Sequence, residues 1–224
     1  ESCHKLGTDL RLLQGTGELS EPFGDAQVGS SAMAYKRNPI RAERMCGLAR
    51  RLLTDALNGP LNAATQWLER SLDDSANRRL VIEDAFLTAD AIVHLAAGIV
   101  RGLRVNESVI AARVAHELPF MATETILMEA VVRGGDRQEL HERLRRYSLE
   151  AQEAIAHGRD NPLIDRVASD GDFRLSGADL TTLLDARAFT GRSAEQVEKF
   201  LATEVDPVLD RAGEVRAAVE EPRV

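Results

Sequence analysis

Residues 76–105 have the pattern of one continuous helix, and this segment restricts the possible folds more than any other part of the chain. Between residues 85 and 100 its only strongly polar side chains are Asp90 and His94. A helix that is apolar on almost every side needs other helices around it. The two polar residues and the charges at both ends distinguish it from a membrane span. We therefore expect this helix inside a bundle that continues into further copies of the chain.

The composition agrees with an all-α protein. Aromatic residues make up only 4% of the 224 residues, and long stretches of Ala, Leu, Glu and Arg favour helix. We predict a helical-bundle portion over residues 1–105 and a smaller helical C-terminal domain over residues 106–224. Residues 158–176 are predicted as loop. Ser193 with Gln196 predicts a capping box at the start of the last helix.

Charge and cysteine content exclude several classes of partner. The formal net charge is -8, which argues against binding to nucleic acid or to an anionic membrane. Cys3 and Cys46 are too few for a disulfide framework, so we predict free thiols that pack in the core, in a cytoplasmic protein. The chain has no signal-peptide pattern and no initiator Met, and it opens directly into a helical pattern. We expect it to be cut or processed from something longer.

A glycine- and serine-rich connection over residues 16–37 is the most informative feature for function. Ser30 and Ser31, followed by Lys36, come directly before Asn38-Pro39, where Asn38 is the expected N-cap of a helix. Free N–H groups and the helix dipole at such a position attract anions. The segment is therefore either an anion-binding loop or a plain solvated connection.

Arginines form two further candidate groups. Glu43 and Arg44 lie just inside the helix that follows the loop, and Arg70, Ser75 and Arg79 surround the start of the apolar helix. Guanidinium groups bind phosphate oxygens in bidentate fashion, so the second group suits a phosphate. Ordinary surface ion pairs and helix capping are the alternative explanation for both.

The remaining candidates are predicted to be structural. Trp67 and Phe86 are expected in the core. The five histidines are scattered, with no pair at metal-binding helical spacing. We therefore expect neither a metal nor a cofactor.

Four motifs resemble a known family. Residues 29–39 read Gly-Ser-Ser-Ala-Met-Ala-Tyr-Lys-Arg-Asn-Pro and resemble the signature of the fumarase/aspartase superfamily. Residues 72–79, 117–124 and 189–192 are similar to its adenylosuccinate lyase branch. The family's proline after Met is Ala34 here, which should loosen the loop. The resemblance covers only the C-terminal part of such a lyase, without the N-terminal part that carries the catalytic histidines.

The resemblance implies a carbon–nitrogen lyase of purine nucleotide synthesis. It would remove fumarate from adenylosuccinate to give AMP, and cleave succinylaminoimidazole carboxamide ribotide in the same way. Ser30 matches the base, Lys36 a residue that stabilises the developing charge, and Glu43 the carboxylate that orients the acidic histidine. The substrate-binding residues implied are Ser31, Met33, Asn38, Arg44, Arg70, Ser75 and Arg79. The implied assembly is a long-helix bundle of the fumarase/aspartase type, a homotetramer with shared active sites and no cofactor.

Two other functions stay open. Another lyase of the superfamily, such as argininosuccinate lyase or fumarase, acts on substrates without phosphate and has no use for Arg70, Ser75 and Arg79. An inactive helical oligomerisation or interaction module has no need of an intact Ser30 and Lys36. By itself this chain is expected to be an incomplete enzyme.

Overall fold

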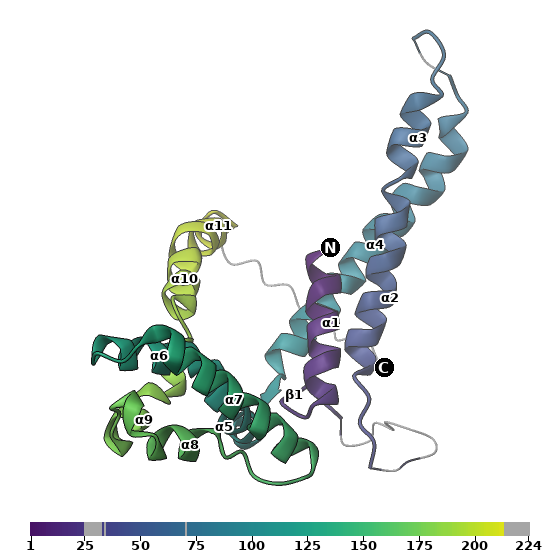
Figure 1. The fold of residues 1–224 in the computed structure, drawn as a ribbon. Coiled ribbons are helices and arrows are strands. Elements are labelled where there is room, and N and C mark those ends of the chain that lie inside the picture. The colour runs from purple at the N-terminus through teal and green to yellow at the C-terminus, as the bar shows by residue number, and fades with distance from the viewer. Residues whose placement is uncertain (25–32, 34, 70, 213–224) are drawn as a thin grey trace. The chain divides into compact units, whose positions relative to one another are not determined.

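Helices account for nearly all regular structure in the computed structural model, which describes residues 1–24, 33, 35–69 and 71–212 (Figure 1). The all-α class is therefore confirmed. Contacts divide the described residues into two compact units, residues 1–109 and 110–212. The predicted domain boundary after residue 105 stays a prediction.

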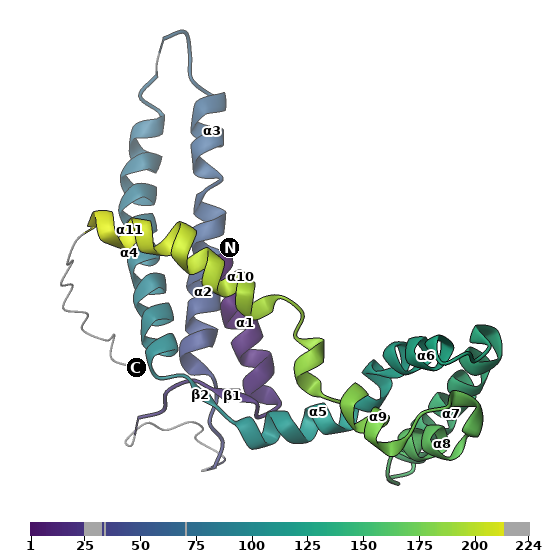
Figure 2. The same ribbon diagram turned by 90° about the vertical axis from the view of Figure 1, so that its left-hand side faces the viewer.

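Three helices lie side by side in the first unit, and a short two-stranded sheet closes one end of it. Figures 1 and 2 show a helical hairpin with α3 at its far end and the sheet at the other end. The elements are α1 (Ser2–Gly15), β1 (Leu19–Ser20), α2 (Ile40–Asp55), α3 (Asn58–Ala64), α4 (Asp74–Arg101) and β2 (Arg104–Val105). The strands pair antiparallel, with Leu19 opposite Val105. The helix predicted over residues 76–105 is confirmed to within a few residues.

The core of the first unit lies where α2 meets α1 and α4. Apolar residues recur at helical spacing on the facing sides, which is the pattern of a buried helix stripe. They are Ala42, Met45 and Ala49 on α2, Ile92, Leu95 and Ile99 on α4, and Leu10 on α1. Gly7 allows α1 to approach closely, because a Cβ added there would lie 2.6 Å from Cys46 Sγ. Cys46 is fully buried and Cys3 half-buried, and both are free thiols, as the sequence predicts.

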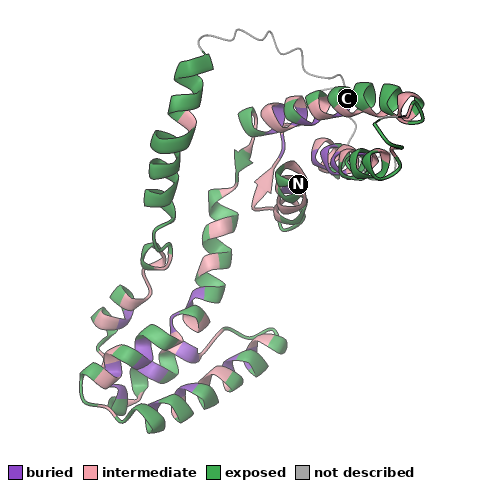
Figure 3. Cartoon of the chain, turned by 90° about the horizontal axis from the view of Figure 1, so that it is seen from above, coloured by how far each residue is buried: buried purple, intermediate pink, exposed green. Residues whose placement is uncertain are grey.

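The other sides of α4 are uncovered within the described chain. Figure 3 shows buried positions on the sides where helices meet and intermediate or exposed positions elsewhere. The prediction that Trp67 and Phe86 are core residues is wrong for this chain, since they are 78% and 75% exposed. Leu80, Leu87 and Val93 of α4 are also exposed. No helix among the described residues is long and apolar enough to cross a membrane.

Amide side chains join α3 to the start of α4. Helix α3 contains no buried residue, so these polar contacts take the place of an apolar core. Asn77 Nδ2 donates to Asn58 Oδ1 over 2.7 Å, and Asn62 Nδ2 donates to Asn77 Oδ1 over 2.9 Å. Gln66 then accepts from the backbone N–H of Ser71 over 3.0 Å. This asparagine ladder holds the far end of the hairpin together without an apolar core.

The second unit packs short helices around one apolar centre. Its first elements are α5 (Glu107–Met121), which begins in the first unit, α6 (Thr123–Val132), α7 (Arg137–Ala156), α8 (Leu163–Ser169), η1 (Gly171–Phe173), α9 (Gly177–Leu183) and η2 (Ala186–Phe189). The loop predicted over 158–176 is wrong there, because α8 and η1 bring fully buried Leu163, Val167 and Phe173 into the core. Arg133, the C-cap residue of α6, binds Asp179 of α9 with two hydrogen bonds of 2.8 Å.

The chain described ends in a helical run with a local irregularity. It comprises α10 (Ser193–Phe200), the π-helical η3 (Leu201–Val205) and α11 (Asp206–Ala212). The capping box predicted at Ser193 is wrong, because Arg192 is the N-cap there and makes no side-chain capping bond. A capping box forms instead between Ser176 and Asp179 at the start of α9.

Replacing Phe173 by Ala tests this account of the second core. The ring is fully buried among residues of α6, α7 and α8. Its loss should leave a cavity and cost about 3–5 kcal/mol of unfolding free energy. Phe200→Ala is the matched control, because the Phe200 side chain is 58% exposed. Chemical denaturation monitored by circular dichroism should show a large loss for Phe173→Ala and little change for the control; equal losses would contradict the assignment.

Candidate active site

The predicted site residues that the structure describes fall into two groups at opposite ends of the first unit. One group surrounds the start of α2 and comprises Met33, Lys36, Asn38, Glu43 and Arg44. The other is at the start of α4 and comprises Ser75 and Arg79. Ser30, Ser31 and Arg70, and also Ala34, lie outside the described residues.

A turn leads from Met33 to Lys36 before α2. The Lys36 N–H donates to the Met33 carbonyl over 3.0 Å, and the Tyr35 hydroxyl donates to Met33 Sδ over 3.6 Å. Met33 and Lys36 both have exposed side chains. The Lys36 ammonium is therefore accessible to an anion from outside this unit.

Helix α2 begins at Ile40, and Pro39 is its N-cap, without a side-chain capping bond. The expectation that Asn38 is the N-cap of this helix is wrong, since Pro39 occupies that position. The Asn38 backbone carbonyl accepts the Ile40 N–H over 2.9 Å. Glu43 and Arg44 are exposed in the first turns of α2, while Ala42 between them and the loop is buried. Their charged groups thus face away from the α1 and α4 contacts.

The carboxylate of Glu21, which sequence reasoning missed, caps α2 instead. Glu21 Oε1 accepts the Arg41 N–H and Oε2 accepts the Ala42 N–H, each over 2.9 Å. The residue is only 3% exposed. Burial raises the pKa of the Glu21 carboxyl above its ordinary value, although the two N–H groups and the Arg41 charge act to lower it. A carboxylate at a helix N-terminus also interacts favourably with the helix dipole.

This cap corrects one physical premise of the anion-binding interpretation. The N–H groups of Arg41 and Ala42 already have an internal carboxylate as their acceptor. They are therefore not vacant for an external anion. Any anion bound here has to be held mainly by side chains such as Lys36 and Arg44.

Two further contacts hold the chain on either side of the loop close to α1. Gln14 Oε1 accepts the Glu21 N–H and Gln14 Nε2 donates to the Arg37 carbonyl, both over 3.0 Å. The Arg37 guanidinium lies 5.1 Å from the centre of the Phe23 ring, a cation–π contact. The residues that enter and leave the loop are thus fixed to one another.

The second group lies at the far end of the hairpin. Ser75 is half-buried in the first turn of α4, and its N–H donates to the Leu72 carbonyl over 3.1 Å. Arg79 follows one turn later with an exposed side chain. Nearby, a hydrogen bond from Ser71 lowers the pKa of Asp73. The hydroxyl and the guanidinium are placed on successive turns of one helix, an arrangement that suits a phosphate.

The structure does not bring the two groups together within one chain. They are separated by the combined length of α2 and α3, which is roughly 35 Å at the rise of an α-helix. Figure 2 shows α3 and the sheet at opposite ends of the hairpin. A single small substrate cannot contact both groups of the same chain.

Metal binding has no support from the described ranges. They contain no group of three or more His, Cys, Asp or Glu side chains placed to hold a metal ion.

Comparison with protein families and curated relatives gives a consistent match. Residues 119–200 match a family model described as adenylosuccinate lyase C-terminus. The chain is 46% identical to adenylosuccinate lyase of Saccharomyces cerevisiae over 209 residues, covering 93% of this chain and 43% of the relative. It is 49% identical to adenylosuccinate lyase of Schistosoma mansoni over 210 residues, with 93% and 44% covered. The chain therefore spans less than half the length of these relatives.

Solved structures show a similar fold. The 3-carboxy-cis,cis-muconate lactonizing enzyme from Pseudomonas putida aligns with a TM-score of 0.73 at 25% identity, over 90% of this chain and 44% of that one. A fumarate lyase from a Mesorhizobium species aligns with a TM-score of 0.70 at 21% identity, with the same coverage. This likeness supports the predicted long-helix architecture.

The buried carboxylate generates a prediction about stability and pH. Because the pKa of Glu21 is raised on folding, its contribution to stability is fully present below the ordinary value of 4.5. That contribution is lost as the pH rises through the raised pKa of the folded chain. Glu21→Gln cannot titrate at this position. The melting temperature of this variant minus that of the unaltered protein should therefore increase as the pH rises through this window. Glu83→Gln, at an exposed position on α4, is the control and should show no such trend; a pH-independent difference for Glu21→Gln would contradict the prediction.

Proposed function

The chain belongs to the adenylosuccinate lyase family, matching its C-terminal region, and from this we propose that it supplies part of an enzyme that cleaves adenylosuccinate to AMP and fumarate. The observation that carries the proposal is identity of 46–49% to two such lyases over 93% of this chain. The same β-elimination would apply to succinylaminoimidazole carboxamide ribotide. We place the reaction in purine nucleotide synthesis in the cytoplasm.

The proposed reaction breaks a C–H bond beside a carboxylate and then a C–N bond. The Ser30 oxygen takes the proton, and the electron pair left on carbon is delocalised into the carboxylate. That pair then forms the double bond of fumarate while an acid protonates the departing nitrogen. A serine can act as base only where positive charge and N–H groups favour its deprotonated form. Lys36 is the described cation nearest to it along the chain.

Other residues around the start of α2 hold and orient the reacting groups in this proposal. Lys36 and Asn38, with Ser31 and Met33, bind the succinyl carboxylates. Glu43 orients an acidic histidine supplied from outside this chain, and its exposed position on α2 supports that role. Arg44, exposed beside it, is the further substrate contact.

Arg70, Ser75 and Arg79 bind the nucleotide phosphate in this proposal. The exposed guanidinium of Arg79 and the hydroxyl of Ser75 one turn before it favour a phosphorylated substrate. Lyases of the same superfamily whose substrates carry no phosphate, such as argininosuccinate lyase, would gain nothing from this group.

We further propose that each active site is assembled from several copies of the chain in a homotetramer. Two observations support this. The two groups of site residues are roughly 35 Å apart by helix length, so different chains must supply them to one substrate. The exposed Phe86, Leu80 and Leu87 on α4 also give the helix an apolar surface of the kind that other subunits cover.

Replacing Ser30 by Ala tests the reaction and the base together. The purified full-length protein should convert adenylosuccinate to AMP and fumarate, detected by mass spectrometry. Ser30→Ala should lower kcat by about 10²–10⁴-fold, the usual contribution of a positioned base, and leave adenylosuccinate binding almost unchanged. Ser108→Ala, at an exposed position on α5, is the control. If Ser30→Ala turns over adenylosuccinate as fast as the unaltered protein, Ser30 is not the base. If the folded, unaltered protein forms no products, an inactive interaction module is favoured instead.

Mixed oligomers test whether active sites are shared. Ser30→Ala and Arg79→Gln remove groups that we assign to different chains at each site. Co-production of these two inactive variants should restore part of the activity, because some sites then receive both intact groups. Co-production of Ser30→Ala and Lys36→Ala is the matched control. It should restore no activity, since every chain then carries a defect in the same group of site residues. If neither pair recovers activity although mixed oligomers form, sharing is contradicted.

A further inference from the structure

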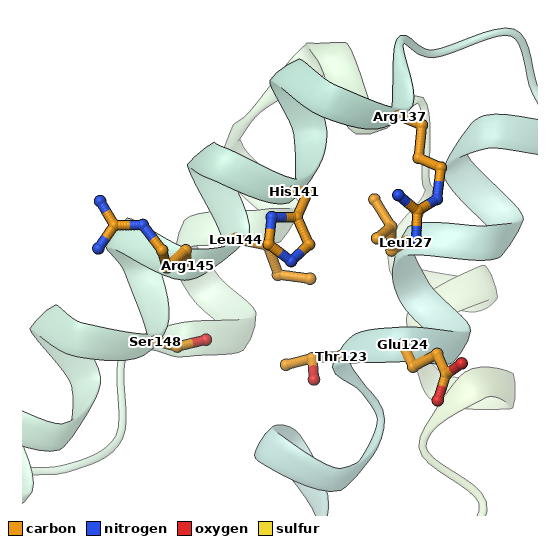
Figure 4. A pocket seen from close by; sticks show the side chains of 8 residues that line it. All are labelled: Thr123, Glu124, Leu127, Arg137, His141, Leu144, Arg145 and Ser148. Carbon is orange, nitrogen blue, oxygen red and sulfur yellow. The ribbon is translucent and has the colours of Figure 1, made fainter.

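A cavity between α6 and α7 in the second unit is lined by none of the residues assigned above. It has a volume of about 340 Å³, which falls within the range of small-molecule sites. Thr123 and Glu124 of α6 form one wall, and α7 forms the other (Figure 4). The buried side chains of Leu127 and Leu144 give it an apolar floor. All lining residues belong to the second unit.

Basic side chains line the α7 wall at intervals of one helical turn. Arg137, His141 and Arg145 are spaced four residues apart, about 6 Å along the helix axis, and so share one face. Arg145 is engaged by Glu142, with Nε–Oε2 and Nη2–Oε1 distances of 2.9 and 2.6 Å. Figure 4 shows its guanidinium pointing away from His141. The side chains of Arg137 and His141 make no hydrogen bond or ion pair with any residue that the structure describes.

Glu124 on the opposite wall adds a negatively charged acceptor. Its carboxylate lines the same cavity as the Arg137 guanidinium, but the two form no ion pair among the described residues. A ligand that satisfies both walls must therefore carry an anionic group for Arg137 and His141 and a hydrogen-bond donor for Glu124. Guanidinium binds phosphate in bidentate fashion, and protein carboxylates accept hydrogen bonds from ribose hydroxyls.

We propose that this cavity binds a ribose phosphomonoester, with the phosphate on Arg137 and His141 and the sugar hydroxyls on Glu124. Thr123 and Ser148 add hydroxyl groups to the two walls. The apolar floor of Leu127 and Leu144 suits the face of an attached base or the carbon side of the sugar. Its lining shares no residue with the nucleotide-phosphate group at Ser75 and Arg79, so the inference does not depend on the proposed reaction.

Calorimetric titration of the purified full-length protein with ribose 5-phosphate tests the proposal. All titrations use the Arg79→Gln variant, which lacks the phosphate-binding arginine assigned on α4. This variant should bind ribose 5-phosphate saturably, and adding Arg137→Gln or His141→Gln should each weaken that binding at least tenfold. Arg137→Lys should weaken it less, because it keeps the charge and loses only the bidentate geometry. Glu124→Gln should lower the affinity for ribose 5-phosphate and leave the affinity for inorganic phosphate unchanged.

Arg159→Gln is the matched control for charge, because it removes an exposed arginine of the same unit that does not line the cavity. It should leave the affinity unchanged. Absence of saturable ribose 5-phosphate binding would overturn the proposal, as would equal weakening by Arg159→Gln and Arg137→Gln. Circular dichroism checks that each variant is folded. Binding without lyase activity would contradict only the proposed function, whereas activity without binding would contradict only this site.

Discussion

The packing of α2 between α1 and α4 is the contact on which the first unit depends. Ala42, Met45 and Ala49 of α2 are buried in one core with Leu10 of α1 and with residues of α4. Since this face of α2 is committed to the core, its other face carries Glu43 and Arg44 outward. The apolar contact therefore decides the direction in which the charged groups of the candidate site are presented. A rotation of α2 would exchange a buried methionine for a buried charge, which is strongly unfavourable.

A buried carboxylate then fixes where that helix begins. Removing Glu21 from water is costly, and the raised pKa shows that burial outweighs its two N–H bonds and the nearby arginine charge. The two hydrogen bonds connect the start of α2 to Glu21, which precedes the loop. Gln14 adds hydrogen bonds to both sides of the same segment. The loop carrying the candidate base thus begins and ends at positions that are determined by α1 and α2 rather than by the loop itself.

Local signals in the sequence predict much of this fold, and contacts distant in sequence account for what they miss. The apolar pattern of residues 76–105 predicts α4, and a local signal marks the start of α7, where the Asp136 side chain accepts N–H groups of the first turn. Glu21 could not be identified in this way, because its partners lie about twenty residues later along the chain. The exposure of Trp67 likewise depends on how helices are arranged. Motif resemblance supplies the names of the candidate site residues, whereas their separation into two groups follows only from the length of the hairpin.

The asparagine ladder has a consequence for how the hairpin aligns. Leucine side chains tolerate sliding of one helix past another by a turn, because apolar contacts have little directional preference. Amide pairs do not, since a shift would break the hydrogen bonds that join Asn58, Asn62 and Asn77. Polar contacts of this kind are a known means of selecting one alignment among several of similar burial. The ladder thus fixes the register of α4 against α3, and with it the position of Arg79 along the helix axis.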